Sequence, residues 1–303
     1  MRFVTFNHDG FTRAGALLDS AASGKSEVLD LSHETFSHCL KGTDPHLLAM
    51  IETGLAHIAR RIMSRSDVEA GARLPLAEVS LLAPLPNPPR IVGAAHNYRC
   101  ALRERGLPLP DAPVLFEKLP TSVIGPDVPV VLPEGAGGVT YEAELAVVIG
   151  QRAEKVAPET ALEHVAGYTL FNDVSASEVI KADGHFERGK NFRTFGPMGP
   201  WLATPEEVDL ATGPRLTLSI DGEMRQDGST ADLVFGIAEL ISLLSYETPL
   251  ASGTVIATGT PAGVAPVQTP PTWLKPGTVM TVAMEGFGQL SNPVESEAAF
   301  HGR

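Results

Sequence analysis

Two glutamates separated by a single residue, Glu142 and Glu144, open the segment 141–150, YEAELAVVIG. Side chains at positions i and i+2 of a strand point to the same face, so these two carboxylates would lie side by side. The residues that follow are apolar on both faces, which predicts a buried strand. Two like charges at this spacing repel each other unless a cation, a proton or water relieves them. A hard divalent ion, which prefers oxygen ligands, would relieve them.

A third carboxylate, Asp173, follows a second apolar segment, residues 167–172. Three carboxylates at neighbouring strand ends could hold Mg²⁺ and leave its other positions to water or to a chelating substrate. The spacing leaves two other interpretations open. The two glutamates could line a solvated strand end, and Asp173 could be the N-cap of a helix that begins near Ser175.

The composition limits the class of protein. A chain of 303 residues with 43% hydrophobic residues can build a large core. A net charge of -13 argues against a protein that binds nucleic acid or anionic membranes. The two cysteines, Cys39 and Cys100, form no zinc or disulfide pattern, and no segment resembles a signal peptide or a membrane span. We therefore expect a cytoplasmic protein with a small-molecule substrate.

The elements before and after the acidic strand are mostly short strands. Residues 1–35 predict a small sheet, and apolar residues at helical spacing predict a helix over 45–62. Four prolines between positions 84 and 89 form an extended connector. We therefore expect a small N-terminal domain, residues 1–83, and a catalytic domain, residues 84–303.

The second domain shows many short apolar segments with turns between them. An Asp221-Gly222 pair predicts a tight hairpin, and residues 233–244 predict one further helix. This pattern favours an α+β fold that is mostly β over a doubly wound one.

Taken together, four segments give the chain a resemblance to the fumarylacetoacetate hydrolase family, over about residues 90–293. They are residues 141–150, 167–175, 188–192 (RGKNF) and 258–261 (TGTP). The resemblance implies a catalytic domain built on a rolled mixed β-sheet, with a homodimer as the usual assembly. It also implies a Mg²⁺ or Mn²⁺ ion held by two Glu and one Asp, here Glu142, Glu144 and Asp173.

The resemblance further implies a reaction. Members of the family act on 2-oxo acids and 1,3-dicarbonyl compounds such as acylpyruvates, which chelate the metal and react through an enolate. Hydrolysis of a C–C bond is the commonest assignment and is the activity we expect. Lys190 matches the active-site lysine, with a catalytic and substrate-binding role. Thr260 matches a loop threonine that contacts the substrate carboxylate.

The chain departs from the family at the lid. Hydrolases of the family carry the motif Asn-Tyr-x-x-His-x-x-Glu, whose His and Glu activate water. Here Asn97, Tyr98 and Glu104 match the motif, but Ala101 stands at the His position. We expect Tyr98 to contact the substrate and Glu104 to be catalytic.

Further replacements bear on the reaction and the substrate. His96 or His185 could assist Glu104 if the fold brings either one inward. Ser177 and Ile180 stand where the family usually has an Arg and a Gln that hold the substrate, which suggests a more apolar substrate.

Three functions remain open on the sequence. The first is a metal-dependent hydrolase of a dicarbonyl compound. The second is a 2-oxo acid tautomerase or isomerase, or a decarboxylase, which needs the metal but no activated water. The third is a binder of metal or ligand without catalysis.

Overall fold

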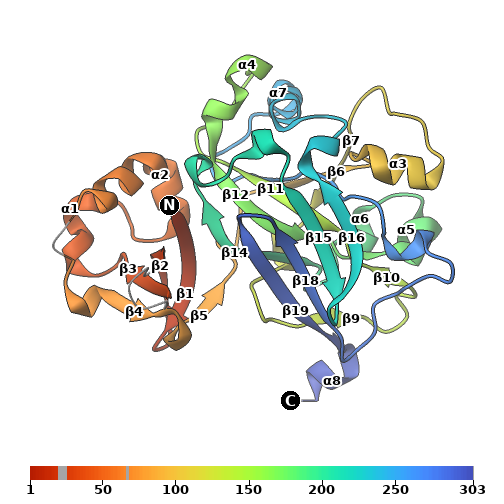
Figure 1. Ribbon diagram of the computed structural model, residues 1–303, viewed down its shortest axis with the longest axis horizontal. Helices are drawn as coiled ribbons and strands as arrows, with labels where there is room; N and C mark the ends of the chain where they lie inside the picture. Colours follow the sequence, from red (N-terminus) through yellow and green to blue (C-terminus); the bar gives the residue numbers. More distant parts are fainter. Residues whose placement is uncertain (20–25, 66–67, 303) are drawn as a thin grey trace.

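The computed structural model describes residues 1–19, 26–65 and 68–302, and most of its strands form two sheets (Figure 1). The larger sheet contains twelve strands. In chain order these are β1 (Arg2–His8), β2 (Phe11–Asp19), β3 (Ser26–Asp30), β4 (Arg73–Pro75), β5 (Ser80–Leu82), β6 (Ile91–Ala95), β7 (Val114–Lys118), β8 (Val123–Ile124), β11 (Ala143–Ile149), β12 (Val165–Asn172), β14 (Gly196–Ala203) and β17 (Val255–Ala257).

The strand order of the larger sheet is β4-β3-β2-β1-β14-β12-β11-β17-β6-β7, with β5 beside β1 and β8 beside β14. The pair β17 and β6 is parallel, whereas β11 is antiparallel to both of its neighbours, so the sheet is mixed. The acidic strand β11 is therefore central, and all seven of its residues are buried.

A second sheet of five strands has the order β16-β15-β18-β19-β9. A main core fills the space between the sheets, with Leu145 and Val147 from β11 in one cluster with Leu218 and Val282 from the second sheet. The fold is thus α+β and mostly β, as predicted. The strands of this sheet are β9 (Val130–Leu132), β15 (Arg215–Ile220), β16 (Glu223–Ser229), β18 (Val279–Met284) and β19 (Gly288–Ser296), and a short pair is formed by β10 (Val139–Thr140) and β13 (Ser175–Ala176).

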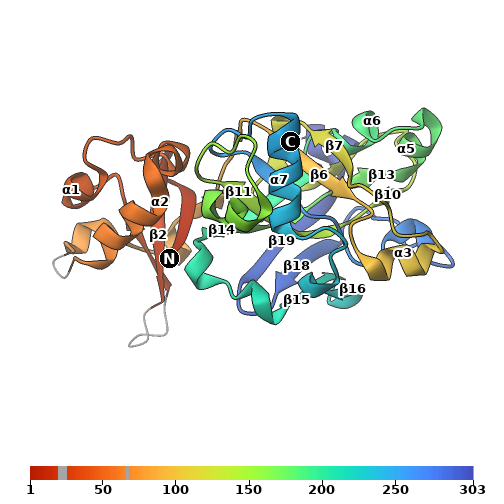
Figure 2. The same cartoon turned by 90° about the horizontal axis from the view of Figure 1, so that it is seen from above.

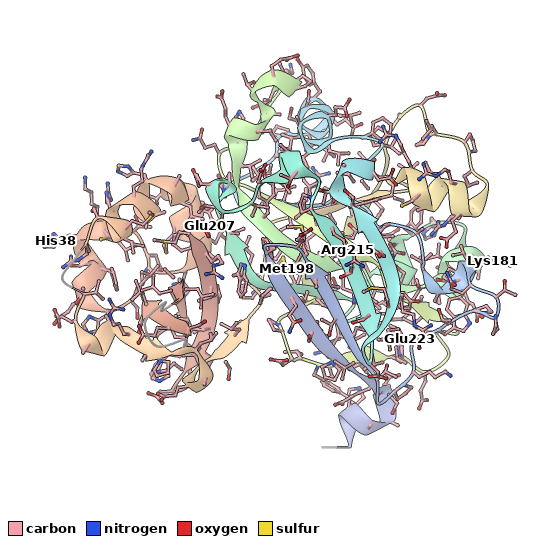
Figure 3. All side chains as sticks on the ribbon, viewed as in Figure 1. His38, Lys181, Met198, Glu207, Arg215 and Glu223 are labelled. Carbon is pink, nitrogen blue, oxygen red and sulfur yellow. The ribbon has the colours of Figure 1, made fainter. Side chains whose placement is uncertain are left out.

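The helices lie around the sheets. Figure 2 and Figure 1 both place α3, α5 and α6 at the end of the molecule remote from the N-terminal strands. In Figure 3, His38 on α1 and Lys181 on α5 mark these two ends. The helices are α1 (Ser37–Leu40), α2 (Leu47–Met63), α3 (Arg99–Arg105), α4 (Pro158–Ala161), α5 (Ser177–Asp183), α6 (Glu187–Lys190), α7 (Ile237–Glu247) and α8 (Glu297–His301).

The N-terminal strands join the larger sheet directly. Strand β1 pairs with β14, with Arg2 opposite Ala203. The amino group of Met1 donates to Glu207 at 2.6 Å, at the junction labelled in Figure 3. The predicted N-terminal sheet and the helix after it are both present. A domain division between residues 83 and 84 stays a prediction, since the sheet continues from one part into the other.

Two local predictions are confirmed by the backbone. Asp221 and Gly222 both have positive φ, 51° and 82°, as a tight hairpin between β15 and β16 requires. The helix predicted over 233–244 also forms, as α7, although it begins four residues later. Among the described residues, no helix is long and apolar enough to cross a membrane.

Candidate active site

The three predicted carboxylates meet at one end of β11 and β12. One oxygen each from Glu142, Glu144 and Asp173 can be chosen so that all three lie within 4.8 Å of one another. The pairing of Ala143 with Asn172 aligns the two strand ends, and the Asp173 amide donates to the Glu142 carbonyl at 2.9 Å. Asp173 and Glu144 are buried and Glu142 is partly exposed, so Glu142 and Glu144 do not form a solvated strand end.

Two lysines neutralise part of this negative charge. Lys190 Nζ lies 2.9 Å from Glu142 Oε2 and 2.5 Å from Asp173 Oδ2, and Lys118 Nζ lies 2.8 Å from Asp173 Oδ1. Burial opposes the charge of Asp173, but the two ammonium groups outweigh it and lower the pKa of this carboxyl. Burial likewise opposes the charge of Lys190, but Asp173 and Glu142 raise its pKa, so the amine stays protonated. Asp173 caps no helix, because Ala176 is the residue before α5.

Among the described residues, no ammonium or guanidinium group forms an ion pair with Glu144. Burial, together with the nearby charges of Asp173 and Glu142, raises its pKa well above the ordinary value. Its Oε2 accepts a hydrogen bond from the Gly259 amide at 2.8 Å. Gly259 has φ 99°, and a Cβ there would come within 2.8 Å of the Ala94 carbonyl oxygen, so only glycine fits this contact.

A small cavity of about 40 Å³ opens on two of these carboxylates and on Lys190. The Lys190 ammonium also lies 4.8 Å from the centroid of the Phe116 ring, a cation–π distance. A larger hollow of about 1160 Å³ shares Phe186 with this cavity but has mainly apolar walls and no carboxylate cluster. We therefore place the chemistry in the smaller one. Its lining consists of Ala94, Ala95, His96, Ala101, Arg105, Glu142, Glu144, Phe186, Lys190 and Thr260.

The lid segment forms α3, and its register decides which residues face this cavity. Ala101 and Arg105 line it, four residues apart on one helix face. Glu104 is exposed and is turned away from the cavity. Its Oε2 accepts from the Gly263 amide at 3.0 Å. The catalytic role of Glu104 stays a prediction, and it would require α3 to turn.

His96 takes a place in the cavity wall just before α3. It has φ 58°, a left-handed conformation that is rare for residues other than glycine. Its Nδ1 lies 3.2 Å from Arg105 Nη1. A guanidinium can only donate, so Nδ1 accepts and the proton of the neutral ring resides on Nε2. Burial, then the charges of Arg105 and Lys190, lower the pKa of His96.

The two predicted substrate contacts differ in position. Thr260 lines the cavity, and its Oγ1 accepts from Gln226 Nε2 at 2.8 Å. Tyr98 is completely buried in a small cluster with Ala101 and Leu233, and it is not part of the cavity lining. Its hydroxyl has no hydrogen-bond partner among the described residues, and burial followed by the charge of Glu144 raises its pKa.

The replaced substrate-holding residues lie elsewhere. Ile180 packs on Gly189, since a Cβ at that glycine would lie 2.4 Å from Ile180 Cγ1. Neither Ser177 nor Ile180 lines the cavity, so the expectation that Ile180 makes the substrate more apolar loses its structural basis. His185 is exposed and lines the larger hollow, so it does not replace the lid imidazole in this arrangement.

The donor set fits a divalent cation such as Mg²⁺ or Mn²⁺. All three candidate ligands are carboxylates, the type that hard cations prefer. Glu144 and Asp173 are buried beside the partly exposed Glu142, although like charges at this spacing repel each other. The pKa of Glu144 is raised first by burial and then by the charges of Asp173 and Glu142, both of which a bound cation would offset.

Three contributors to the site were missed from the sequence. Lys118 and Arg105 were overlooked, and so was Gln226, whose side-chain oxygen accepts from the Ala143 amide at 2.8 Å. Gln226 also donates to the Pro261 carbonyl at 2.9 Å and so ties the Thr260 loop to the acidic strand. No sequence pattern indicated Gln226, because it is the single buried residue of a strand without alternation of apolar and polar residues.

Comparisons with known proteins agree with this geometry. A family model described as fumarylacetoacetate (FAA) hydrolase C-terminal matches residues 90–295. A protein of Burkholderia cenocepacia named putative hydrolase is 41% identical over 202 residues, 66% of this chain and 72% of that protein. A mitochondrial oxaloacetate tautomerase of Bos taurus is 33% identical over 296 residues, 97% of this chain and 91% of that protein. The structure of a fumarylacetoacetate hydrolase from Exiguobacterium antarcticum has a TM-score of 0.80 and 33% identity, covering 98% of this chain and 100% of that chain.

Proposed function

This chain belongs to the fumarylacetoacetate hydrolase family, and from that premise we propose that it is a divalent-metal-dependent tautomerase of a small 2-oxo acid. The reaction moves one proton between the carbon next to the carbonyl group and the carbonyl oxygen, with no other change in the atoms. Glu142, Glu144 and Asp173 would hold Mg²⁺ or Mn²⁺. The bound cation would supply Lewis acidity toward the oxygens of the 2-oxo acid.

The register of the lid helix carries this proposal. A C–C hydrolase must activate a water molecule, which the family's lid does with an imidazole and a carboxylate. Here Ala101 lines the cavity where that imidazole is expected, and Glu104 is bonded to the Gly263 amide outside it. Proton transfer within the substrate needs no water activated as a nucleophile, so a tautomerase does not require the imidazole that is missing at position 101.

Two cavity residues receive roles in this reaction. Lys190 stays protonated, so it would stabilise the negative charge that develops on the substrate and would not accept a proton. His96 is a neutral imidazole with its proton on Nε2 while Arg105 donates to Nδ1. It would therefore donate a hydrogen bond from Nε2 to a substrate oxygen in the cavity, without giving up its proton. Thr260, whose hydroxyl is fixed by Gln226, would contact the substrate carboxylate.

Hydrolysis of a C–C bond in an acylpyruvate or another 1,3-dicarbonyl compound is the second candidate. The putative hydrolase of Burkholderia cenocepacia, 41% identical to this chain, favours it. In that case a turn of α3 would bring Glu104, and with it Tyr98, toward the substrate. For either activity we propose a cytoplasmic homodimer, which light scattering would test.

Proton NMR in D₂O tests the two candidates side by side. The protein with Mg²⁺ is mixed with oxaloacetate, the compound named for the bovine relative, and separately with acetylpyruvate. The tautomerase predicts faster keto–enol exchange and deuteration at C3, both lost with EDTA. Release of pyruvate and acetate from acetylpyruvate, also lost with EDTA, would establish the hydrolase instead. If neither change occurs, both activities are rejected for these two compounds.

A further inference from the structure

We infer that Arg105 recognises a second anionic group on the substrate, so that the site selects 2-oxo acids with two carboxylates over those with one. This inference rests on the proposed function, whose site it completes. It assigns to α3 a role in specificity, carried by a residue outside the lid motif.

The first observation is that Arg105 is a cavity-facing cation with no carboxylate in ion-pair contact among the described residues, and Glu142 attracts it only over a longer distance. It is partly buried and lines the cavity together with Glu142 and Lys190. Among the described residues, no carboxylate oxygen lies within 4.0 Å of its guanidinium nitrogens, and its Nε is buried without a hydrogen-bond partner. The guanidinium therefore has donors at the cavity wall that an anion from outside the chain could use.

The second observation is the position of His96. Its Nδ1 accepts from Arg105 Nη1 at 3.2 Å, which fixes the guanidinium at the cavity wall without supplying a negative charge. The imidazole ring also lies 6.5 Å from the Phe186 ring, centroid to centroid. The guanidinium is therefore held in place before any ligand binds, and a planar fork of donors suits a carboxylate.

The third observation is the balance of charge. A divalent cation in this site would add two positive charges to the three of Lys118, Lys190 and Arg105. The three carboxylates carry three negative charges, so the net charge of the site would be +2. A monocarboxylic 2-oxo acid would leave one of these charges uncompensated, whereas a dicarboxylic one would compensate both. The carboxylate next to the oxo group would lie at the cation, and the distal carboxylate at Arg105.

Calorimetric titration with two stable ligands tests this inference without turnover. L-malate and 2-hydroxybutyrate differ only in that malate has a carboxylate where 2-hydroxybutyrate has a methyl group, and neither can enolise. In the presence of Mg²⁺ we expect the Kd of malate to be at least about tenfold lower, as a charge-assisted contact provides. In Arg105→Gln the two Kd values should become similar through a loss of malate affinity, and Arg105→Lys should restore part of the difference.

A matched control comes from the same helix. Arg103 is 69% exposed, so Arg103→Gln should leave both Kd values unchanged. Equal Kd values for the two ligands in the wild type would overturn the inference. An equal loss of affinity for both ligands in Arg105→Gln would also overturn it, because a residue with a purely structural role would have that effect. Tautomerase activity is measured separately. A malate preference without activity rejects the proposed function alone, and activity without the preference rejects the role of Arg105 alone.

Discussion

Lys118 Nζ lies 2.8 Å from Asp173 Oδ1, and both side chains are almost completely buried. Lys118 comes from the end of β7 and also donates to the Val174 carbonyl at 3.4 Å. Because Lys190 holds the other carboxylate oxygen, Asp173 is fixed from two sides before a metal ion binds. Lys118 is thus a positioning residue for a candidate ligand.

Removal of that ammonium should destabilise the protein strongly. In Lys118→Met, Asp173 keeps only one of its two cationic partners, and breaking a buried ion pair costs about 3–5 kcal/mol of unfolding free energy. Urea denaturation in EDTA measures the change. The control is Arg188→Gln, which breaks an exposed pair with Asp183 and should have little effect. Equal losses of unfolding free energy in the two variants would show that the buried ion pair contributes no more to stability than the exposed one.

Binding of a divalent cation should depend on the three carboxylates. Glu142→Gln and Asp173→Asn keep the shape of each side chain but remove a charged ligand, so Mg²⁺ affinity should fall by at least about tenfold, with loss of activity. Titration with MgCl₂ and with MnCl₂ measures the affinity directly. Glu104→Gln is the matched control, because that carboxylate is bonded to Gly263 and is not a candidate ligand. Unchanged metal affinity in both ligand variants would remove the metal hypothesis.

The stability of the metal-free protein should fall as the pH rises above about the ordinary pKa of Glu144, 4.5. Burial raises this pKa, so the folded state holds the proton more tightly than the unfolded state does. The resulting stabilisation is complete below the unfolded pKa and is lost as the pH rises through the raised value, at up to about 1.4 kcal/mol per pH unit.

Denaturation midpoints in EDTA, from about pH 5 to about pH 8, measure this loss. Glu144→Gln carries no titrating group at this position, so its profile should be flatter than that of the wild type. The lowered pKa of His96 has the opposite effect on stability below pH 6.5. Because His96 is present in both proteins, this effect cancels in the comparison. Parallel profiles would contradict the assignment of the uncompensated charge to Glu144.

The sequence was sufficient where the interactions that determine the structure are local. Spacing within a strand predicted that Glu142 and Glu144 lie together, and the Asp221-Gly222 pair predicted its hairpin. Lys118 could not be found in this way, because 55 residues separate it from Asp173 and a lysine at a strand end is ordinarily exposed. Contacts made by folding distant segments together leave no periodic pattern in the chain.

The lid helix illustrates a different limit. The family motif predicts that positions 101 and 104, which are three residues apart, face the substrate. Successive helix residues are turned by about 100°, so Glu104 lies about 60° from Ala101 and about 100° from Arg105 around the helix, and in the observed register it faces away from the cavity. The motif identifies the segment, but the rotation of the helix about its axis depends on tertiary contacts such as the bond between Glu104 and the Gly263 amide.

Ala101→His should introduce C–C hydrolysis if the missing imidazole is what limits the chain to proton transfer. Ala101 faces the cavity, and a general base there contributes about a hundredfold or more in enzymes that use one. Because Glu104 is engaged elsewhere, we expect a smaller gain, about tenfold in pyruvate release from acetylpyruvate measured by NMR.

The control for this gain must have similar bulk without a base. Ala101 is 5% exposed and packs near Tyr98 and Leu233, so any larger side chain costs about 1–3 kcal/mol of stability through overpacking. Ala101→Leu shares that cost and should cleave no faster than the wild type. Adding Glu104→Gln to Ala101→His tests whether this carboxylate acts together with the new imidazole. Slower cleavage in the double variant than in Ala101→His would mean that α3 turns and brings Glu104 into the cavity. Equal cleavage by the His and Leu variants would mean that the lid residue does not decide between tautomerase and hydrolase.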